Sequence, residues 1–425
     1  MNLHIENLAK VASADLVFDG ITVIVGDNNT GKSTVGKALW AMFSAFANLE
    51  ARVKGLRQEK CADILGEFDR RFIGWRHAWD SDKMGAALLD GSLDVSAAVE
   101  KLMGMANEAQ ETPKRDEWIL RLNEVLSLTL EELRSQVVYN VLARMFNRQC
   151  VSFLCAGTRP VLELTVQQQK VRVEMTDSLP VVESEIALQH QAYYFDNPDL
   201  LSRMEAMPRW HYWQDREIEF SSDISVQIID KYARKAKSDG NAIDDLLISK
   251  KFGEIERKLE DLMGGSIQYD PEHGLQFRCQ QFPSHPLRLG NLSEGLKAMG
   301  LLQAAFHSGA IGTDDVLILD EPEVHLHPEW QIRYAEFIVL LQKAFNLTIL
   351  LTSHSPDFVQ AIRLFSRKHG LSGRLNGYIS RLNDDGSAVM DPIENGGWDR
   401  AFEGFARSYD ILTALRAEIG DPDDE

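Results

Sequence analysis

The glycine-rich segment at residues 26–34, Gly-Asp-Asn-Asn-Thr-Gly-Lys-Ser-Thr, constrains the fold of this chain more than any other stretch. It fits the pattern Gly-x-x-x-x-Gly-Lys-Ser and follows an apolar run at 21–25 that predicts a buried strand. A helical apolar pattern continues from 35 to 46. Because strand, glycine loop and helix N-terminus together form a cradle of backbone N–H groups, the sequence predicts a phosphate-binding loop.

The residues of this loop have separate expected roles. Gly26 and Gly31 let the backbone turn its N–H groups toward a β-phosphate. Lys32 can reach the β- and γ-phosphates, and the Ser33 hydroxyl can hold Mg²⁺. The alternative is an ordinary glycine turn between a strand and a helix. The candidate nucleotide-binding residues are Gly26, Asn28, Asn29, Thr30, Gly31, Lys32, Ser33 and Thr34.

Two carboxylates follow a second apolar run, at 316–319, which predicts a buried parallel strand. Open α/β sheets bind ligands at the carboxyl ends of their strands, where these acids stand. We expect Asp320 to join Ser33 in holding Mg²⁺, and Glu321 to orient and polarise an attacking water. A further apolar run precedes His354, which is a candidate γ-phosphate sensor, although a lone histidine at a strand end is more often a structural hydrogen-bonding group.

A Ser-x-Gly turn lies shortly before the acidic strand and opens a predicted helix that runs to about residue 307. Serine is a common helix N-cap, so the turn alone has a structural explanation. Its position ahead of Asp320 and Glu321 makes Ser293 and Gly295 candidates for nucleotide binding.

The formal net charge of −19 limits how the 425-residue chain can meet nucleic acid. The net negative charge of the protein repels the phosphates of nucleic acid. Salt screens charges beyond roughly 8 Å, however, so a local basic patch can still bind DNA or RNA. Most basic runs are solvated faces, and most aromatic groups are packed. The candidate surfaces are the basic runs Lys231, Arg234, Lys235 and Lys237, and Arg363, Arg367 and Lys368, with the aromatic group at 209–213.

The remaining composition indicates a cytoplasmic protein. The cysteines, at positions 61, 150, 155 and 279, lack metal-ligand spacing, which is typical of reduced structural thiols. The chain begins without a signal-peptide pattern, and none of its apolar runs approaches the roughly 20 residues that span a bilayer. We therefore expect no membrane partner.

The four motifs, in this order, resemble the ATP-binding-cassette (ABC) ATPases. More narrowly they resemble the soluble branch that includes the structural-maintenance-of-chromosomes (SMC) proteins, Rad50, RecF and the OLD-type (overcoming lysogenization defect) ATPases. Asn28 and Asn29, and the sequence Glu-Val-His-Leu-His-Pro at 323–328, point toward the OLD-like side. The resemblance implies an α/β fold, an ABC-type P-loop ATPase head with a mixed or parallel sheet core and a large, mostly helical insertion. It also implies ATP and Mg²⁺ as cofactors and ATP hydrolysis as the activity.

The resemblance further implies assembly through ATP. Two copies would dimerise head to tail, with the Ser293 hydroxyl and the Gly295 amide of one completing the γ-phosphate site of the other, and with His327 lining the interface. Stand-alone chains of this build resemble the ATPase components of bacterial anti-phage systems such as Septu and PARIS, which implies a separate nuclease or toxin as effector. An ATP-dependent DNA clamp of RecF or Rad50 type is the main alternative.

Two departures from the family pattern affect these expectations. Glu294 and Leu296 replace residues usual in the signature, so an ATP-binding scaffold with negligible turnover is a further alternative. Asp196 and Asn197 stand where a magnesium-sensing glutamine is usual.

Residue patterns and motifs together predict an order of segments. Strands are expected at 3–8, 14–18, 152–155, 161–166, 171–175 and 192–195, hairpins at 267–278 and 377–390, and a helix at 399–418. We expect an N-terminal part of the ATPase core with the P-loop (1–47), a helical insertion (48–150), a β-rich first-lobe segment (151–199), a helical lobe (200–264) and a C-terminal part of the core with the signature, the acidic Walker B strand and the switch histidine (265–425).

Overall fold

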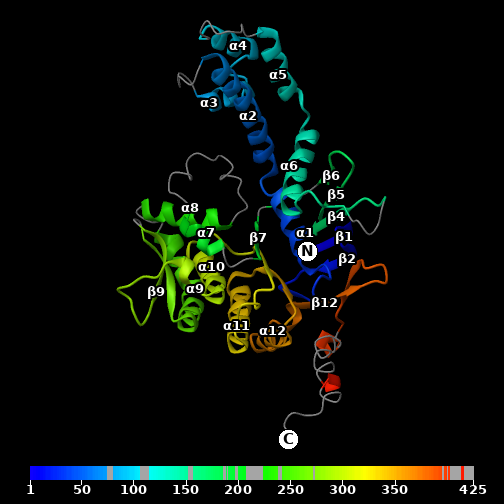
Figure 1. Ribbon diagram of the computed structural model, residues 1–425, viewed down its shortest axis with the longest axis vertical. Helices are drawn as coiled ribbons and strands as arrows, with labels where there is room; N and C mark the ends of the chain where they lie inside the picture. Colours follow the sequence, from blue (N-terminus) through cyan, green and yellow to red (C-terminus); the bar gives the residue numbers. More distant parts are fainter. Residues whose placement is uncertain are drawn as a thin grey trace.

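One mixed sheet joins strands from both ends of the chain (Figure 1). The computed structural model describes residues 1–73, 80–105, 114–151, 157–184, 188, 190–196, 200–206, 224–237, 242–270, 273–394, 397–399, 401–402 and 413–415. Among these, eleven strands pair in the order β6-β5-β4-β1-β2-β13-β12-β3-β11-β10-β7. Their bounds are β1 (Asn2–Leu8), β2 (Val11–Val17), β3 (Ile21–Val25), β4 (Val161–Val166), β5 (Gln169–Glu174), β6 (Val181–Ser184), β7 (Ala192–Phe195), β10 (Val316–Asp320), β11 (Thr348–Ser353), β12 (Leu375–Leu382) and β13 (Ala388–Pro392).

The two halves of the sheet differ in direction. From β6 to β2 all neighbours are antiparallel, whereas β12, β3, β11, β10 and β7 are parallel. Every residue of β3 is buried, as is typical of parallel strands covered on both faces. The expected α/β class with a mixed sheet core is therefore confirmed.

The register of the parallel strands brings the motif residues to one edge. Asp320, the last residue of β10, is paired with Thr352 of β11, and Thr352 is in turn paired with Ile24 of β3. Phe195, the last residue of β7, is paired with Leu319. The loops that follow these strands therefore leave the sheet side by side.

Helices cover both faces of this parallel half. Helix α1 (Lys32–Phe46) packs on the face that includes Ile24, Ile318 and Leu350. The opposite face, with Val23 and Leu317 among its residues, is covered by α10 (Glu294–His307), α11 (Pro328–Phe345) and α12 (Pro356–Lys368). Alternation along each strand thus divides the core into two clusters.

A helical arm rises from the α1 side of the sheet (Figure 1). Helices α2 and α6 form its stem, and the tip has its own aromatic core of Phe68, Phe72 and Trp118. The expected large, mostly helical insertion is therefore present. Its elements are α2 (Leu49–Phe68), the π-helical turn η1 (Asp69–Ile73), α3 (Ser81–Leu89), α4 (Val95–Met103), α5 (Arg115–Ser127) and α6 (Leu130–Met145).

A second group of elements packs beside α10. It comprises α7 (Leu200–Ala206), α8 (Ile224–Lys237), α9 (Ala242–Met263), the hairpin of β8 (Gly265–Asp270) and β9 (Gly274–Cys279), and the short turn η4 (Leu289–Asn291). A further short turn, η5 (Ser372–Arg374), follows α12. Both expected hairpins are present, β8–β9 and β12–β13. The predicted strand at 152–155 and the aromatic group at 209–213 lie outside the described residues, as does most of the predicted helix at 399–418. Over the described part of the chain, the helices are all too short or too polar to cross a membrane.

Candidate nucleotide-binding site

The loop between β3 and α1 needs both of its glycines. Gly31 has a φ of 85° and Gly26 a φ of 153°, and a Cβ on Gly26 would lie 2.7 Å from the Ser380 carbonyl oxygen. The Ser380 hydroxyl donates to the carbonyl oxygen of Thr30, whose own hydroxyl donates to Asp27 O at 2.7 Å. Strand β12, from the C-terminal part of the chain, therefore packs against the loop and forms a hydrogen bond with it. Asn28 and Asn29, at the tip of the loop, are exposed.

Lys32 lies inside this loop and is 4% exposed. Its Nζ donates to Gly26 O at 2.9 Å and to Asp27 O at 2.8 Å, and lies 3.7 Å from Glu321 Oε1. A buried ammonium group requires such partners. The ammonium group of Lys32 thus lies between the glycine loop and the carboxylate of Glu321, which follows β10.

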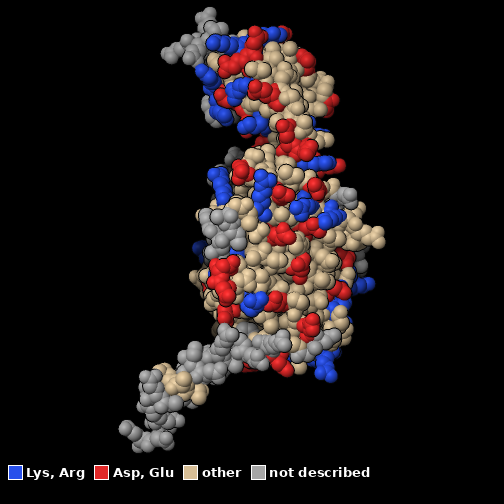
Figure 2. Space-filling view, turned by 90° about the vertical axis from the view of Figure 1, so that its right-hand side faces the viewer, with Lys and Arg blue, Asp and Glu red and all other residues tan. Residues whose placement is uncertain are grey.

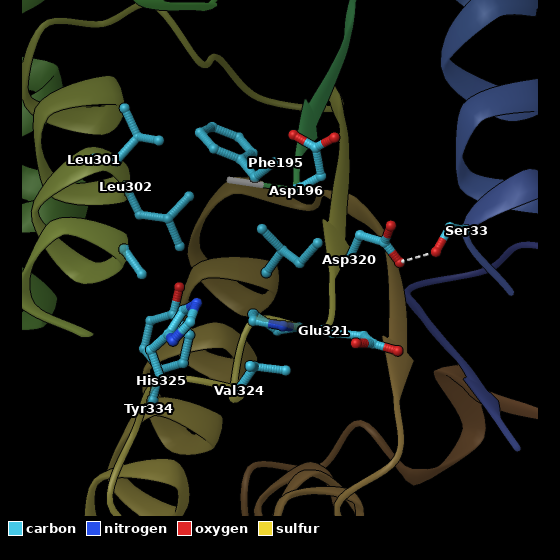
Figure 3. Close-up of a pocket in the computed structure, with 13 residues that line it drawn as sticks. Ser33, Phe195, Asp196, Leu301, Leu302, Asp320, Glu321, Val324, His325 and Tyr334 are labelled. Carbon is cyan, nitrogen blue, oxygen red and sulfur yellow. Dashed lines mark hydrogen bonds between the residues drawn. The ribbon is translucent and has the colours of Figure 1, made fainter. Parts of the chain in front are cut away.

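Ser33 and Asp320 meet across the sheet edge, as Figure 3 shows. The Ser33 hydroxyl donates to Asp320 Oδ1 at 3.1 Å, and Thr352 Oγ1 donates to the same oxygen. The Tyr194 hydroxyl donates to Asp320 Oδ2 at 2.7 Å. Burial, together with the charge of Asp320, raises the pKa of Tyr194 above its ordinary value, so this hydroxyl remains a donor at neutral pH. Both oxygens of Asp320 are therefore oriented.

This pair fits a magnesium ion that is shared with a nucleotide. Mg²⁺ prefers oxygen ligands and is usually bound through one or two carboxylates plus phosphate and water. The hydroxyl of Ser33 and the carboxylate of Asp320 supply two such oxygens. Among the described residues, no group of three or more His, Cys, Asp or Glu side chains forms a stand-alone metal site.

Glu321 begins the turn after β10 in the left-handed backbone conformation, with a φ of 49°. A non-glycine residue there is strained, and strained residues cluster at functional sites. Its N–H donates to the Thr352 carbonyl oxygen at 3.1 Å and hydroxyl oxygen at 3.0 Å. Its Oε1 lies 3.5 Å from His354 Nδ1 as well as 3.7 Å from Lys32 Nζ. The carboxylate therefore lies between the two candidate phosphate-contacting side chains.

A cavity of about 230 Å³ opens beside these residues (Figure 3). Asp196 lines it together with Ser33, Asp320 and Glu321, so the predicted position of the magnesium-sensing residue borders the site, while Asn197 lies outside the described residues. The rest of the wall is mostly apolar and also includes His325 and Tyr334; its apolar residues are Phe195, Ala298, Leu301, Leu302, Leu319, Pro322 and Val324.

The signature residues lie apart from this group within one chain. Ser293 is exposed and caps α10, accepting from Leu296 N at 3.4 Å. Gly295 is buried, and a Cβ there would lie 2.8 Å from Leu326 Cδ2. Among the described residues that line the cavity, α10 contributes Ala298, Leu301 and Leu302, but neither Ser293 nor Gly295. Glu294, which departs from the usual signature sequence, has a charge partner in its own helix. The buried Lys297 amine donates to Glu294 Oε1 at 2.7 Å.

Two residues of the basic run at 363–368, a candidate nucleic-acid surface, make contacts within the chain. The Arg363 guanidinium lies 4.9 Å from the centre of the Trp398 ring, and Lys368 pairs with Glu336 at 2.9 Å. Lys231 of the other basic run is exposed, but the side chains of 234, 235 and 237 lie outside the described set. Figure 2 shows Lys and Arg interspersed with Asp and Glu over the visible face.

The structure therefore brings Lys32, Ser33, Asp320, Glu321 and His354 together, whereas Ser293 and Gly295 do not line the cavity beside them. Sequence reasoning missed Tyr194 and Thr352, which orient Asp320. Both are hydroxyl-bearing residues inside apolar strands, and a polar atom there signals a buried partner.

Family models match most of the chain. A model described as "AAA ATPase domain" matches residues 1–262, and one described as "AAA domain, putative AbiEii toxin, Type IV TA system" matches residues 214–359. No curated protein matches the chain.

Solved structures of Smc heads are similar to the chain at low identity. One, a Smc head bound to the C-winged helix domain of ScpA, is 13% identical over 92% of this chain and 97% of that chain, with a TM-score of 0.45. The SMC head domain from Thermotoga maritima is 11% identical over 93% and 98%, with a TM-score of 0.37. The Smc head domain with an extended coiled coil, bound to the C-terminal domain of ScpA derived from Pyrococcus furiosus, is 12% identical over 98% of both, with a TM-score of 0.42. TM-scores below 0.5 leave these as similarities alone.

Proposed function

Because the chain belongs to the AAA ATPase domain family, we propose that it is an ABC-type ATPase whose ATP-dependent dimerisation controls a partner effector. The observation that carries the ATPase part of the proposal is the position of Glu321 Oε1, 3.7 Å from Lys32 Nζ and 3.5 Å from His354 Nδ1. A carboxylate beside a lysine and a histidine is suited to orient water against a γ-phosphate.

Each residue of the site has a role in this proposal. The backbone N–H groups after Gly31 and the amine of Lys32 bind the phosphates, and Ser33 and Asp320 hold Mg²⁺. The ion, when bound, neutralises charge on the phosphate oxygens. Glu321 polarises the attacking water. His354 donates to the γ-phosphate and so distinguishes ATP from ADP.

The proposed dimer explains why Ser293 is exposed. In the proposed dimer the exposed Ser293 hydroxyl, the Gly295 amide and the N-terminus of α10 would together bind an anion. In the 321–327 turn, against which Gly295 packs, Val324 is 47% exposed and His325 and His327 are exposed. A second copy would cover this surface and bring Ser293 to the γ-phosphate held by Lys32.

The Glu321→Gln variant tests both parts. Slowed hydrolysis should leave ATP in the site, so light scattering after size exclusion should give a dimer with ATP and Mg²⁺ and a lower mass with ADP. Adding Lys32→Met to the variant provides the control, because it should abolish the ATP effect. An unchanged mass with ATP, under conditions where ATP binding is measured directly, would refute the head-to-tail mechanism.

The effector and a role in defence are a separate part of the proposal. The second family description names a toxin of a toxin–antitoxin system, which is compatible with a chain that acts together with a toxic partner. Co-expression with the product of the adjacent gene provides the test. If that product is a nuclease or toxin, it should copurify with the Glu321→Gln variant in ATP; co-purification of DNA instead would favour the clamp.

A wild-type chain that binds ATP but releases no phosphate would favour the scaffold with negligible turnover. The engagement of Arg363 and Lys368 within the chain offers no added support for a DNA clamp.

A further inference from the structure

Glu323 is a buried carboxyl that belongs to no role assigned above. It is 1% exposed. Its Oε1 accepts from Ser353 Oγ at 2.6 Å and from the backbone N–H of His354 at 3.2 Å. Its Oε2 is buried and has no hydrogen-bond partner among the described residues. Burial raises the pKa of Glu323, although the hydrogen bond from Ser353 opposes the shift.

The side chain of Gln331, like that of Glu323, connects the turn after β10 with the loop after β11. Gln331, in the first turns of α11, donates from Nε2 to Glu323 O at 3.3 Å and to Leu326 O at 3.1 Å. Its Oε1 accepts from Ser355 Oγ at 2.7 Å, and this hydroxyl also caps α12 by accepting from Phe358 N. The turn that begins at Glu321 and the loop that carries His354 are therefore joined on both sides of His354.

These contacts determine where the imidazole of His354 can lie. The side chain of His354 is 41% exposed, so packing alone leaves it free to turn. Its backbone, in contrast, is held by Glu323 and by the neighbouring Ser353, which is fully buried. Without an acceptor at position 323, two donors on consecutive residues would be left unsatisfied, and the loop would have to move to pair them.

We infer that Glu323 is a positioning residue for the hydrolysis of ATP: it holds the 353–355 loop so that His354 stays beside Glu321. This inference rests on the proposed function. A general structural role would affect nucleotide binding as well as turnover. The positioning role predicts that loss of Glu323 lowers turnover, through His354, and does not act on nucleotide binding.

The kinetic test uses Glu323→Ala, Glu323→Gln, His354→Ala and the Glu323→Ala/His354→Ala pair. Because displacing a catalytic group by about 1 Å costs about 100-fold, kcat of Glu323→Ala should fall about 10- to 100-fold. The KM for ATP should change less than about threefold, as expected for an interaction that acts on the chemical step. Glu323→Gln should restore kcat to within about threefold of the wild type, since its amide oxygen accepts both hydrogen bonds.

The double variant separates positioning through His354 from an independent effect. Once His354 is removed, removing Glu323 should cost less than about a further twofold, because residues that act as a unit are not additive. A matched control is Glu336→Ala: Glu336, in the middle of α11, also ties α11 to α12, but its partners Lys368 and His369 lie at the C-terminal end of α12, away from His354. Its kcat should equal that of the wild type.

Hydrogen exchange supplies a readout that needs no turnover. The amide of His354 should exchange faster in Glu323→Ala than in the wild type, and Glu323→Gln should restore its protection. Equal exchange in all three proteins would overturn the contact, and kcat losses that multiply in the double variant would overturn the positioning role. A wild-type chain without ATP turnover would overturn the proposed function and the kinetic part of this inference together, while the exchange measurement would still decide the contact.

Discussion

Replacing Gly295 with alanine tests how closely α10 packs against the turn that follows β10. The added Cβ would lie 2.8 Å from Leu326 Cδ2 and 3.0 Å from the His325 carbonyl oxygen, whereas ordinary contact begins at 3.4 Å. The leucine methyl can rotate away, but a backbone oxygen cannot. The turn or the helix must therefore shift by a few tenths of an ångström.

The cost can be bounded. Overpacking by one carbon costs about 1–3 kcal/mol, and alanine recovers about 0.5–1 kcal/mol relative to glycine in a helix. The free energy of unfolding should therefore fall by about 1 kcal/mol, and by at most about 2.5 kcal/mol. An unfolding entropy of about 2.1 cal/mol/K per residue amounts to about 0.9 kcal/mol/K for a chain of 425 residues, so Tm should drop by about 1–3 °C. Alanine keeps the backbone N–H of position 295, so any loss of ATP-dependent assembly would come from displacement of the helix N-terminus and not from a lost donor.

Differential scanning calorimetry measures this shift directly, and Gly66→Ala is the matched control. Gly66 lies in the last turn of α2, and a Cβ there has nothing within 4 Å. That variant should melt at or slightly above the wild-type temperature, because it gains helix propensity without a clash. If Gly295→Ala also melts at or above the wild-type temperature and assembles normally with ATP, the close-packing argument is wrong.

Three further substitutions test separate parts of the molecule. Lys32→Met should weaken ATP binding about 10- to 100-fold, measured by displacement of a fluorescent nucleotide, because it removes a charge-assisted contact to phosphate. Trp118→Ala should destabilise the arm tip by about 3–5 kcal/mol, giving an earlier calorimetric transition with ATP binding unchanged, because its core is separate from that of the sheet. The third is His4→Gln. Burial lowers the pKa of His4, but hydrogen bonds with Asp15 and Glu6 outweigh this effect, so the pKa of His4 is raised above its ordinary value. Its contribution, less than about 1 kcal/mol for so exposed a group, is therefore full below about pH 6.5 and lost as pH rises through the folded pKa, so the variant should flatten the dependence of Tm on pH between 5 and 9.

Local patterns sufficed to predict the P-loop and the acidic strand. The loop follows five buried residues of β3, and Asp320 ends an equally apolar strand, so each motif carries its structural context within a few residues. Because parallel strands end at one edge of a sheet, these local predictions also implied that Ser33 and Asp320 would lie close together. In the structure the Ser33 hydroxyl donates a hydrogen bond to Asp320.

The contacts that sequence reasoning missed depend on register or on long-range pairing. Tyr194 faces Asp320 only because β7 pairs with β10 in the register that sets Tyr194 against Ile318. Strands β12 and β13, from the C-terminal part of the chain, pair between β3 and β2, which lie next to each other in sequence. Ser380 consequently lies behind the glycine loop. A hydrophobic pattern sets which face of a strand is buried, but it does not set which strand lies beside it.

The two faces of the sheet divide the site between them. The cluster that contains Val35 and Leu39 of α1 anchors the helix that begins with Lys32 and Ser33, and it lies on the opposite face from the cluster that anchors α10, α11 and α12. Gly36 marks how closely α1 is pressed onto the sheet, because a Cβ there would lie 3.1 Å from both Ile318 and Tyr194. The part that carries Lys32 and Ser33 and the part that carries Glu321 and His354 are therefore connected mainly through β3, β11 and β10. Since a packed sheet is far stiffer than a loop, the distance between Ser33 and Asp320 is fixed by strand register, and any adjustment that the proposed hydrolysis requires falls to the turns that follow β10 and β11, where Glu321 is strained and Glu323 is buried.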